Sequence, residues 1–316
     1  MSESVVQKNE INARDNRLAV NLCGIELENP IIPASGTFGF GAEFARLWDI
    51  NELGTFSFKG TTAAPRDGNA QPRVADAPGG MLNAIGLANP GVDTVVAQTL
   101  PKMAQYFRKP VISNVAGFSI AEFCEVASKL DAVEQVGWHE INISCPNVHE
   151  GGKNFADDPH SAAKVCRAVK EVTAKPVIMK LAPNAGNTVE TALACQEAGA
   201  DGLSLINTFV GMRLNLRTGK PILANRTGGV SGPGILPMAL RMVWDVSRAV
   251  EIPVVGIGGV SCSEDVIEML HAGAAAVQIG TANLRDPYVC RDIIRELPSV
   301  MDRLGIRRLT DLRGSR

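Results

Sequence analysis

One pattern repeats along most of this chain: a short apolar run, then a polar or glycine-rich turn, then a stretch with helical spacing of apolar residues. The apolar runs number eight and lie at residues 30–34, 55–58, 110–115, 140–144, 176–181, 202–206, 253–257 and 275–279. Near-continuous apolar strands that alternate with helices are typical of parallel βαβ units, because such strands are buried on both faces. The pattern therefore predicts an α/β protein with a parallel sheet.

Eight consecutive units favour a closed (β/α)8 TIM barrel. Such a barrel typically needs about 250 residues, and this chain has 316. An open doubly wound sheet is the alternative, but no segment marks the point where its strand order would reverse. Between the runs, helices are predicted at residues 161–173, 188–198, 237–249 and 263–272. Gly199 and Gly273 are suitable helix stops, and either Ser261 or Ser263 is a suitable cap for the last helix.

Three segments stand outside this repeat. Residues 18–27 alternate in polarity around Cys23-Gly24 and predict an N-terminal β-hairpin. The connections at 61–104, after the second strand, and 209–237, after the sixth, exceed the usual length and are expected to be lids or interface pieces. Residues 1–17 are polar and mixed in charge. We expect them to be a disordered tail, followed by a single catalytic domain over residues 18–316.

Composition excludes several classes of function. The formal net charge is −2 with no basic block, which argues against nucleic acid as the main partner. No run of 18 apolar residues occurs, so no membrane span is predicted. The seven cysteines are scattered without a Cys-x-x-Cys pair, and the four histidines show no ligand spacing. We therefore expect a reduced, cytoplasmic protein with no metal site of its own.

The expected active site lies at the C-terminal ends of the barrel strands. Each predicted strand ends in polar or glycine residues there: Ser35, Lys59, Asn114, Asn142 to Cys145, Lys180, Asn207-Thr208, Gly258-Gly259 and Gly280-Thr281. A single lysine at a strand end is usually a solvated rim residue. Two lysines that emerge from apolar runs beside three asparagines favour a site that stabilises developing negative charge.

Glycines close the seventh and eighth strands, where TIM barrels commonly bind a phosphate group. Small residues let backbone N–H groups approach the anion, and a helix N-terminus adds a favourable dipole. The glycine-rich run at 228–234 either lies beside the ends of the seventh and eighth strands or is only a flexible turn. Because no dinucleotide fingerprint follows a first strand, flavin mononucleotide (FMN) is favoured over NAD or FAD within this chain.

The fourth strand runs into Ile143-Ser144-Cys145-Pro146-Asn147, a thiol flanked by hydrogen-bonding side chains and stopped by proline. A thiol can move a proton, and the carboxamides of Asn142 and Asn147 can hold a polar ring. The alternative is a buried strand end with an inert cysteine, since free cysteine is among the most buried residue types.

These motifs resemble those of the class 1 dihydroorotate dehydrogenases, specifically the class 1B catalytic subunit, over about residues 18–314. The matching segments are Ala34-Ser35-Gly36-Thr37-Phe38-Gly39, Lys59-Gly60-Thr61-Thr62, Asn83-Ala84-Ile85-Gly86-Leu87-Ala88-Asn89-Pro90-Gly91, Asn142-Ile143-Ser144-Cys145-Pro146-Asn147 and Val277-Gln278-Ile279-Gly280-Thr281. The resemblance implies a TIM barrel that oxidises (S)-dihydroorotate to orotate in pyrimidine biosynthesis and passes hydride to FMN.

The resemblance also assigns residues to roles. Cys145 is the expected base that removes a proton from C5 of the substrate, and Lys59 and Lys180 complete the catalytic set. The expected substrate-binding residues are Lys59, Asn83, Ala84, Ile85, Gly86, Leu87, Asn142, Asn147, Asn207 and Thr208. The expected FMN-binding residues are Ser35, Lys59, Gly60, Asn114, Asn142, Lys180, Ile206, Gly232, Gly258, Gly259, Gly280 and Thr281.

Class 1B subunits work with a partner subunit that carries FAD and a [2Fe–2S] cluster and passes electrons to NAD. The resemblance therefore implies an iron–sulfur flavoprotein partner and a homodimeric core within a heterotetramer. Three alternatives stay open: a class 1A-like enzyme that uses fumarate, an FMN-dependent dihydropyrimidine dehydrogenase, and a phosphate-binding barrel without activity. The second usually has histidine where this chain has Asn147, and the intact Lys59, Cys145 and Lys180 disfavour the third.

Overall fold

The computed structural model describes residues 17–143, 149–150, 153–155, 158–184 and 186–314. Its centre is a curled sheet of seven parallel strands in the order β3-β15-β14-β11-β10-β7-β6. Their bounds are β3 Ile31–Pro33, β6 Val111–Val115, β7 Val136–Asn142, β10 Val177–Lys180, β11 Gly202–Leu205, β14 Val254–Ile257 and β15 Ala276–Ile279. All seven correspond to predicted runs, although β7 begins four residues before the predicted start at residue 140.

The predicted second strand, residues 55–58, closes this sheet into a barrel. The Ser57 N–H donates to the Pro33 carbonyl of β3 (3.0 Å), and the Ile112 N–H of β6 donates to the Phe56 carbonyl (3.0 Å). The segment thus bonds to both edge strands, although it pairs with β6 only through an isolated bridge between Ser57 and Ile112. Eight parallel segments therefore form the barrel, and the predicted TIM-barrel fold is confirmed.

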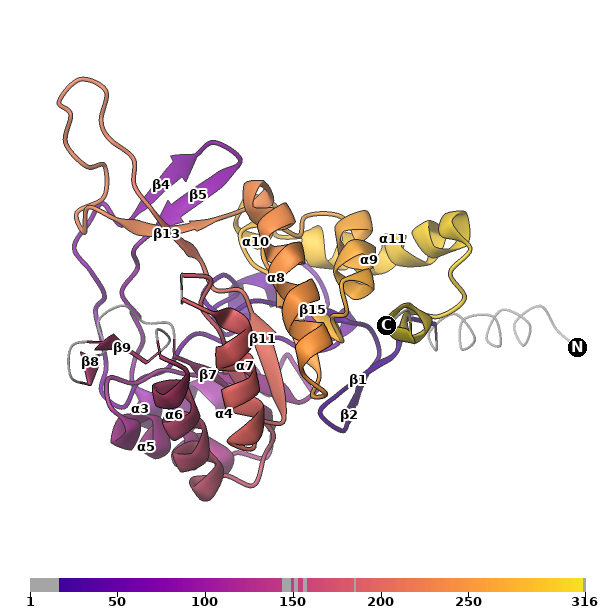
Figure 1. The fold of residues 1–316 in the computed structure, drawn as a ribbon, viewed down its shortest axis with the longest axis horizontal. Coiled ribbons are helices and arrows are strands. Elements are labelled where there is room, and N and C mark those ends of the chain that lie inside the picture. The colour runs from indigo at the N-terminus through magenta and orange to yellow at the C-terminus, as the bar shows by residue number, and fades with distance from the viewer. Residues whose placement is uncertain (1–16, 144–148, 151–152, 156–157, 185, 315–316) are drawn as a thin grey trace, which may run out of the picture.

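Helices surround the barrel, as Figure 1 shows. They are α2 Ala42–Ala45, α3 Val92–Thr94, α4 Leu100–Met103, α5 Ile120–Asp131, α6 Pro159–Val172, α7 Thr188–Glu197, α8 Leu236–Ala249, α9 Ser263–His271, α10 Ala282–Arg285 and α11 Val289–Leu304. The four predicted helices are α6 to α9, and Gly199 and Gly273 follow two of them with positive φ. Neither predicted serine is the N-cap of α9; Cys262 occupies that position, and the backbone N–H groups of Ser261 and Cys262 donate to Asp265.

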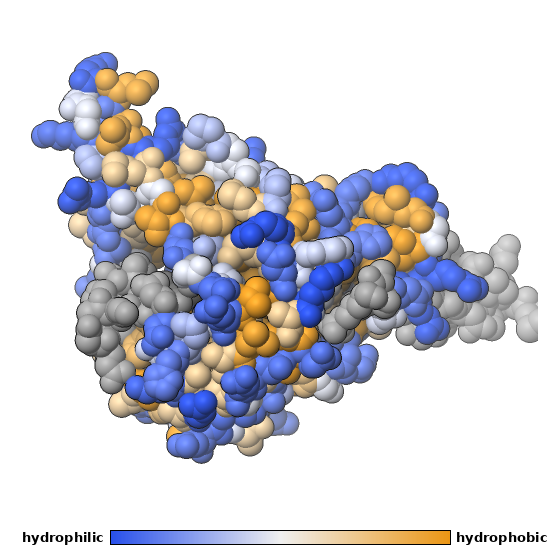
Figure 2. Space-filling model, in the orientation of Figure 1, coloured by the Kyte–Doolittle hydropathy of each residue, from blue (hydrophilic) through white to orange (hydrophobic). Residues whose placement is uncertain are grey.

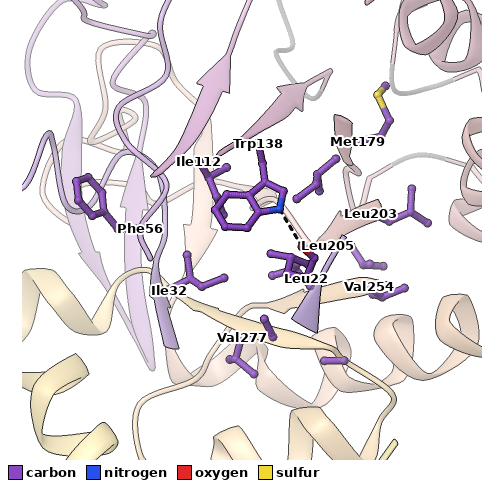
Figure 3. Packing of buried hydrophobic residues seen from close by; sticks show 14 of the residues in the cluster. Leu22, Ile32, Phe56, Ile112, Trp138, Met179, Leu203, Leu205, Val254 and Val277 are labelled. Atoms are coloured by element: carbon purple, nitrogen blue, oxygen red, sulfur yellow. Dashed lines mark hydrogen bonds between the residues drawn. The ribbon is translucent and has the colours of Figure 1, made fainter. Parts of the chain in front are cut away.

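The predicted N-terminal hairpin is present as β1 (Val20–Leu22) and β2 (Ile25–Leu27). It packs against Trp138 of β7, which is fully buried and donates its indole N–H to the Leu22 carbonyl (3.0 Å; Figure 3). Arg17, assigned from sequence to the tail, binds the carbonyls of Ile306 and Arg307 at the C-terminal side of the molecule. The rest of the predicted tail lies outside the described residues.

The two long connections pair with each other. The first contains β4 (Val74–Ala77) and β5 (Gly80–Asn83), and the second contains β12 (Phe209–Gly211) and β13 (Gly228–Ser231). Together they form an antiparallel sheet in the order β12-β13-β5-β4. The glycine-rich run at 228–234 is thus largely a strand, and the reading of it as a flexible turn was wrong.

The segment between β12 and β13 projects beyond the barrel, and apolar side chains are visible on it (Figures 1 and 2). Leu216 on this segment is 99% exposed. A further two-stranded hairpin, β8 (His149–Glu150) with β9 (Lys153–Asn154), follows β7. Within the described part of the chain, no helix is both long and apolar enough to cross a membrane.

Candidate functional site

A polar cluster occupies the middle of the barrel, centred on Glu140 of β7. Successive side chains of a strand point to opposite faces, so Glu140 shares the inward face of β7 with Trp138 and Asn142. Its side chain is fully buried. Its carboxylate accepts hydrogen bonds from Ser57 Oγ (3.1 Å), Asn114 Nδ2 (2.6 Å), Ser204 Oγ (2.8 Å) and Gln278 Nε2 (2.7 Å).

Lys180 supplies the countercharge to this carboxylate. Its Nζ lies 3.4 Å from Glu140 Oε2 and 3.4 Å from the hydroxyl oxygen of Ser35, and the lysine is only 5% exposed. Burial alone would raise the pKa of Glu140. Lys180 and the hydrogen bonds from Gln278, Ser204 and Asn114 outweigh burial and hold this pKa below its ordinary value. The cluster therefore contains a charged carboxylate beneath a lysine at the strand ends.

The second predicted lysine, Lys59, follows the strand segment 55–58. Its backbone N–H donates to the Gly39 carbonyl (2.9 Å), which anchors the strand end. Burial lowers the pKa of the Lys59 ammonium, and the nearby charge of Arg73 lowers it further. A cation that is partly removed from water and faces a like charge is prepared to bind an anionic group, which would restore its favourable electrostatics.

The predicted substrate loop, Asn83 to Leu87, begins at the last residue of β5 and lies against the Lys59-Gly60 strand end. A side-chain carbon of Leu87 lies 3.4 Å from where a Cβ on Gly60 would stand. Asn69 anchors the loop, because its backbone N–H donates to the Ile85 carbonyl and its side-chain amide donates to the Ala84 carbonyl. The structure thus places this loop beside Lys59, one of the two expected catalytic lysines.

The ends of β7 and β11 meet through two predicted asparagines. Asn207 Nδ2 donates to Asn142 Oδ1 (3.3 Å), and the Thr208 N–H donates to Asn207 Oδ1 (2.8 Å). Both asparagines are partly exposed, so their carboxamides stand at the boundary between core and solvent. Thr208 also packs against Gly229 of β13, where a side chain would collide with it. These residues form one polar edge of the site.

The predicted phosphate corner is assembled from three strand ends. Gly258 and Gly259 follow β14 with φ of 124° and 83°, and a Cβ on Gly259 would lie 2.6 Å from the backbone of Leu236, the first residue of α8. Thr281 Oγ1, after β15, donates to Ser231 Oγ at the end of β13 (2.7 Å). Gly232, after β13, and Gly280, after β15, complete the corner. Ile206, another predicted flavin-binding residue, follows β11, and its side chain lies 3.3 Å from where a Cβ on Gly258 would stand. Close backbone approach beside a long helix's N-terminus suits an anion.

Two predicted residues, Cys145 and Asn147, lie outside the described residues. Four residues of the cluster were not predicted: Glu140, Ser57, Ser204 and Gln278. Each belongs to one of the predicted apolar runs, so the apolar pattern concealed them. A carboxylate at the start of the predicted apolar run 140–144 was the signal that could have identified Glu140, because charged residues are almost never fully buried unless paired.

An unpartnered oxygen allows the fit of a flavin to be judged. Among the described residues, Asn114 Oδ1 and Gln278 Oε1 are buried side-chain oxygens without a hydrogen-bond donor. Asn114 Oδ1 would lie 2.9 Å from a Cβ on Gly60, so it faces the Lys59-Gly60 strand end. The isoalloxazine ring of a flavin carries one N–H between two carbonyls. The site offers an acceptor for such a donor, lysines for negative charge and a corner for phosphate, and a flavin therefore fits.

Known proteins with similar sequences give a consistent picture. A family model described as Dihydroorotate dehydrogenase matches residues 17–301. A protein of Anoxybacillus flavithermus named dihydroorotate dehydrogenase B (NAD(+)), catalytic subunit, is 55% identical over 299 residues, or 95% of this chain and 96% of the relative. A protein of the same name from Geobacillus sp. (strain WCH70) is 54% identical, with 95% of each chain covered. Because the match spans nearly the whole chain, this protein belongs to the dihydroorotate dehydrogenase family.

Proposed function

We propose that this chain is the catalytic subunit of an NAD-linked dihydroorotate dehydrogenase, which oxidises (S)-dihydroorotate to orotate in the synthesis of UMP. The observation that carries the proposal is the 54–55% identity, over 95% of the chain, to relatives that bear this name. The paired carboxylate and lysine within the barrel support it, because an inactive barrel would gain little from a buried ion pair.

The family is flavin-dependent, and the proposed cofactor in this chain is FMN. A bound FMN would supply the chemistry of hydride acceptance at this site. Lys180 would face the negative charge of the reduced ring, and Asn114 would accept from the ring N–H. Gly258, Gly259 and Thr281 would hold the phosphate through backbone and hydroxyl groups. The other proposed contacts are Ser35, Lys59, Gly60, Asn142, Ile206, Gly232 and Gly280.

The substrate is proposed to lie between the Asn83–Leu87 loop and the polar edge formed by Asn142, Asn207 and Thr208. Asn147 is proposed to complete this edge on the basis of its sequence motif. Cys145 is proposed to accept the C5 proton as the C6 hydrogen leaves as hydride, so that one carbon–carbon double bond forms and two hydrogens depart. A free thiol titrates near 8.5, so it supplies more base at neutral pH than serine does.

The relatives' names contain the words catalytic subunit and NAD(+), which imply a second subunit that handles electrons. The proposed partner is an iron–sulfur flavoprotein with FAD and a [2Fe–2S] cluster, bound to a homodimer of this chain. The proposed location is the cytoplasm. Electrons would leave the substrate here and reach NAD only in the complex.

Anaerobic spectroscopy of the purified protein tests this function. We expect a yellow protein whose flavin is bleached by dihydroorotate, and whose denaturation releases FMN. NAD reduction should require the co-purified partner. A colourless protein, or bleaching by dihydrouracil but not by dihydroorotate, would contradict the proposal. Rapid turnover with fumarate and no need for a partner would instead indicate a class 1A-like enzyme.

The Cys145→Ser variant tests the proposed base. We expect it to retain FMN but to be reduced by dihydroorotate on the order of 10²-fold or more slowly at neutral pH, because serine is a poorer base without assistance. Stopped-flow absorbance of the bound flavin measures the rate. Cys124→Ser is the matched control, since Cys124 lies on helix α5 outside the barrel. An equal rate in both variants would remove Cys145 from the mechanism.

A further inference from the structure

Glu140 is buried beneath residues that are expected to touch the flavin. We propose that Glu140 is a positioning residue of the flavin site, which orients the Asn114 carboxamide and offsets part of the positive charge of Lys180. The inference rests on the proposed function, because it assumes that FMN binds at this end of the barrel. Glu140 itself acts through its neighbours.

The hydrogen bonds of Glu140 connect much of the barrel. Its Oε2 accepts from Ser57, Asn114 and Lys180, and its Oε1 accepts from Ser204 and Gln278. These five donors come from the segment 55–58 and from β6, β10, β11 and β15. A carboxylate has about four lone-pair sites, so this one is saturated. Any movement of Glu140 would therefore move groups on most sides of the barrel at once.

The carboxylate also determines which way two amides face. An ionised carboxylate can only accept hydrogen bonds, so Asn114 and Gln278 must each turn their NH₂ group toward Glu140. Their oxygens are consequently directed away from it, and these are the two buried oxygens without a donor among the described residues. Asn114 Oδ1 faces Gly60, at the expected flavin site. Glu140 thus makes the site present an acceptor there, where a flipped Asn114 would present a donor.

The charge of Glu140 acts through Lys180. A lysine at the strand ends favours reduction of a bound flavin, because its positive charge stabilises the negative charge that the reduced ring acquires. Glu140 Oε2 lies 3.4 Å from Lys180 Nζ, where both groups are shielded from solvent. The carboxylate therefore cancels part of that effect. Loss of its charge should make the flavin easier to reduce and should leave Asn114 free to flip.

The Glu140→Gln variant of the holoenzyme, titrated anaerobically against a reference dye, measures this effect. We expect the reduction equilibrium to shift about tenfold toward reduced flavin, which is about 30 mV for a two-electron couple. We also expect FMN to bind about tenfold more weakly by fluorescence, because a flipped Asn114 would oppose the ring N–H. Ser204→Ala is the matched control, since it removes one hydrogen bond to the same carboxylate without changing charge. Its shift should stay below about threefold.

Two results would overturn the inference: an unchanged flavin potential in Glu140→Gln, or an equal shift in Ser204→Ala. If Glu140→Gln does not fold, Glu140→Asp replaces it. That variant keeps the charge, so its potential should stay within about threefold of the wild type, and a tenfold shift would contradict the proposed charge effect. Failure of the proposed function is a separate outcome, because the wild-type protein would then lack FMN or fail to be reduced by dihydroorotate.

Discussion

Neighbouring residues of one strand, Glu140 and His139, form two buried polar clusters on opposite sides of β7. Glu140 faces the barrel interior. His139 faces the helices, where its Nδ1 lies 2.7 Å from Ser113 Oγ and its Nε2 lies 3.1 Å from Asp131 Oδ1. Both side chains are fully buried. The same backbone therefore carries two ionisable groups into the protein in opposite directions.

The two clusters differ in protonation. Glu140 has five donors, one of them a cation, so its charged form prevails despite burial. For His139, burial lowers the pKa, and the raising effect of Asp131 does not overcome it. The carboxylate is thus charged and the imidazole is neutral. The inner cluster reaches the strand ends where the site lies, whereas the outer cluster joins β6, β7 and α5. We propose that the Glu140 cluster serves the flavin site and that the His139 cluster serves stability.

The largest expected effect follows from removing Lys180, the cation of the inner cluster around Glu140. Lys180→Ala should slow flavin reduction by dihydroorotate by roughly 10²–10³-fold, because a preorganised charge at the reacting ring is lost. It should also cost about 3–5 kcal/mol of stability, since Glu140 is left as an uncompensated buried charge. Stopped-flow reduction and urea unfolding measure the two effects.

Lys170→Ala is the matched control for that prediction. Lys170 of α6 pairs with Asp201 at 2.7 Å, but both side chains are about one-third exposed. Such a pair is worth about 0–1 kcal/mol, and it lies among the outer helices. A comparable loss of reduction rate in Lys170→Ala would show that the inner ion pair has no special role.

The outer cluster should make stability depend on pH. Because the folded pKa of His139 is lowered, the folded protein binds fewer protons than the unfolded chain, and stability falls as pH drops below the unfolded value of about 6.5. The pKa of Asp131 is lowered to about 2 by hydrogen bonds from Thr173, His139 and the backbone, which outweigh its desolvation. Its contribution is present above about pH 3.9 and is lost as pH falls toward 2.

Thermal melts between pH 7 and 5 test the histidine contribution. We expect the melting temperature of the wild type to fall over this range, and His139→Gln to flatten that fall. A variant with the wild-type slope would show that His139 does not titrate on unfolding in this window. Flavin reduction by dihydroorotate, measured at pH 7, should stay the same in this variant, because the outer cluster does not reach the strand ends.

The smallest expected effect is that of Ser113→Ala, which removes one hydrogen bond from the outer cluster. We expect a loss of about 1–2 kcal/mol, since the partner nitrogen of His139 is left unsatisfied in a buried position. Flavin potential and reduction rate should stay within twofold of the wild type. A tenfold slower flavin reduction in Ser113→Ala would contradict the assignment of the outer face of β7 to stability alone.

Much of the fold was predictable because parallel barrel strands are buried on both faces and stand out as apolar runs. The strand ends were predictable for a related reason: Lys59, Asn114 and Lys180 interrupt those runs. Glu140 was hidden at the start of a run that the structure extends back to Val136. The sheet formed by β12, β13, β5 and β4 was also missed, because pairing between segments more than a hundred residues apart leaves no local pattern.

The sequence by itself determined the eight-unit repeat, the family and the set of polar residues at the strand ends. Only the tertiary structure decided which of those residues face one another, because strand register and barrel closure determine the direction in which each side chain points. A shift of one residue along β7 would exchange the places of Glu140 and His139. The pattern of apolar residues specifies that a strand is buried. Whether a charged side chain on that strand has a partner depends on the strands and helices that pack against its two faces.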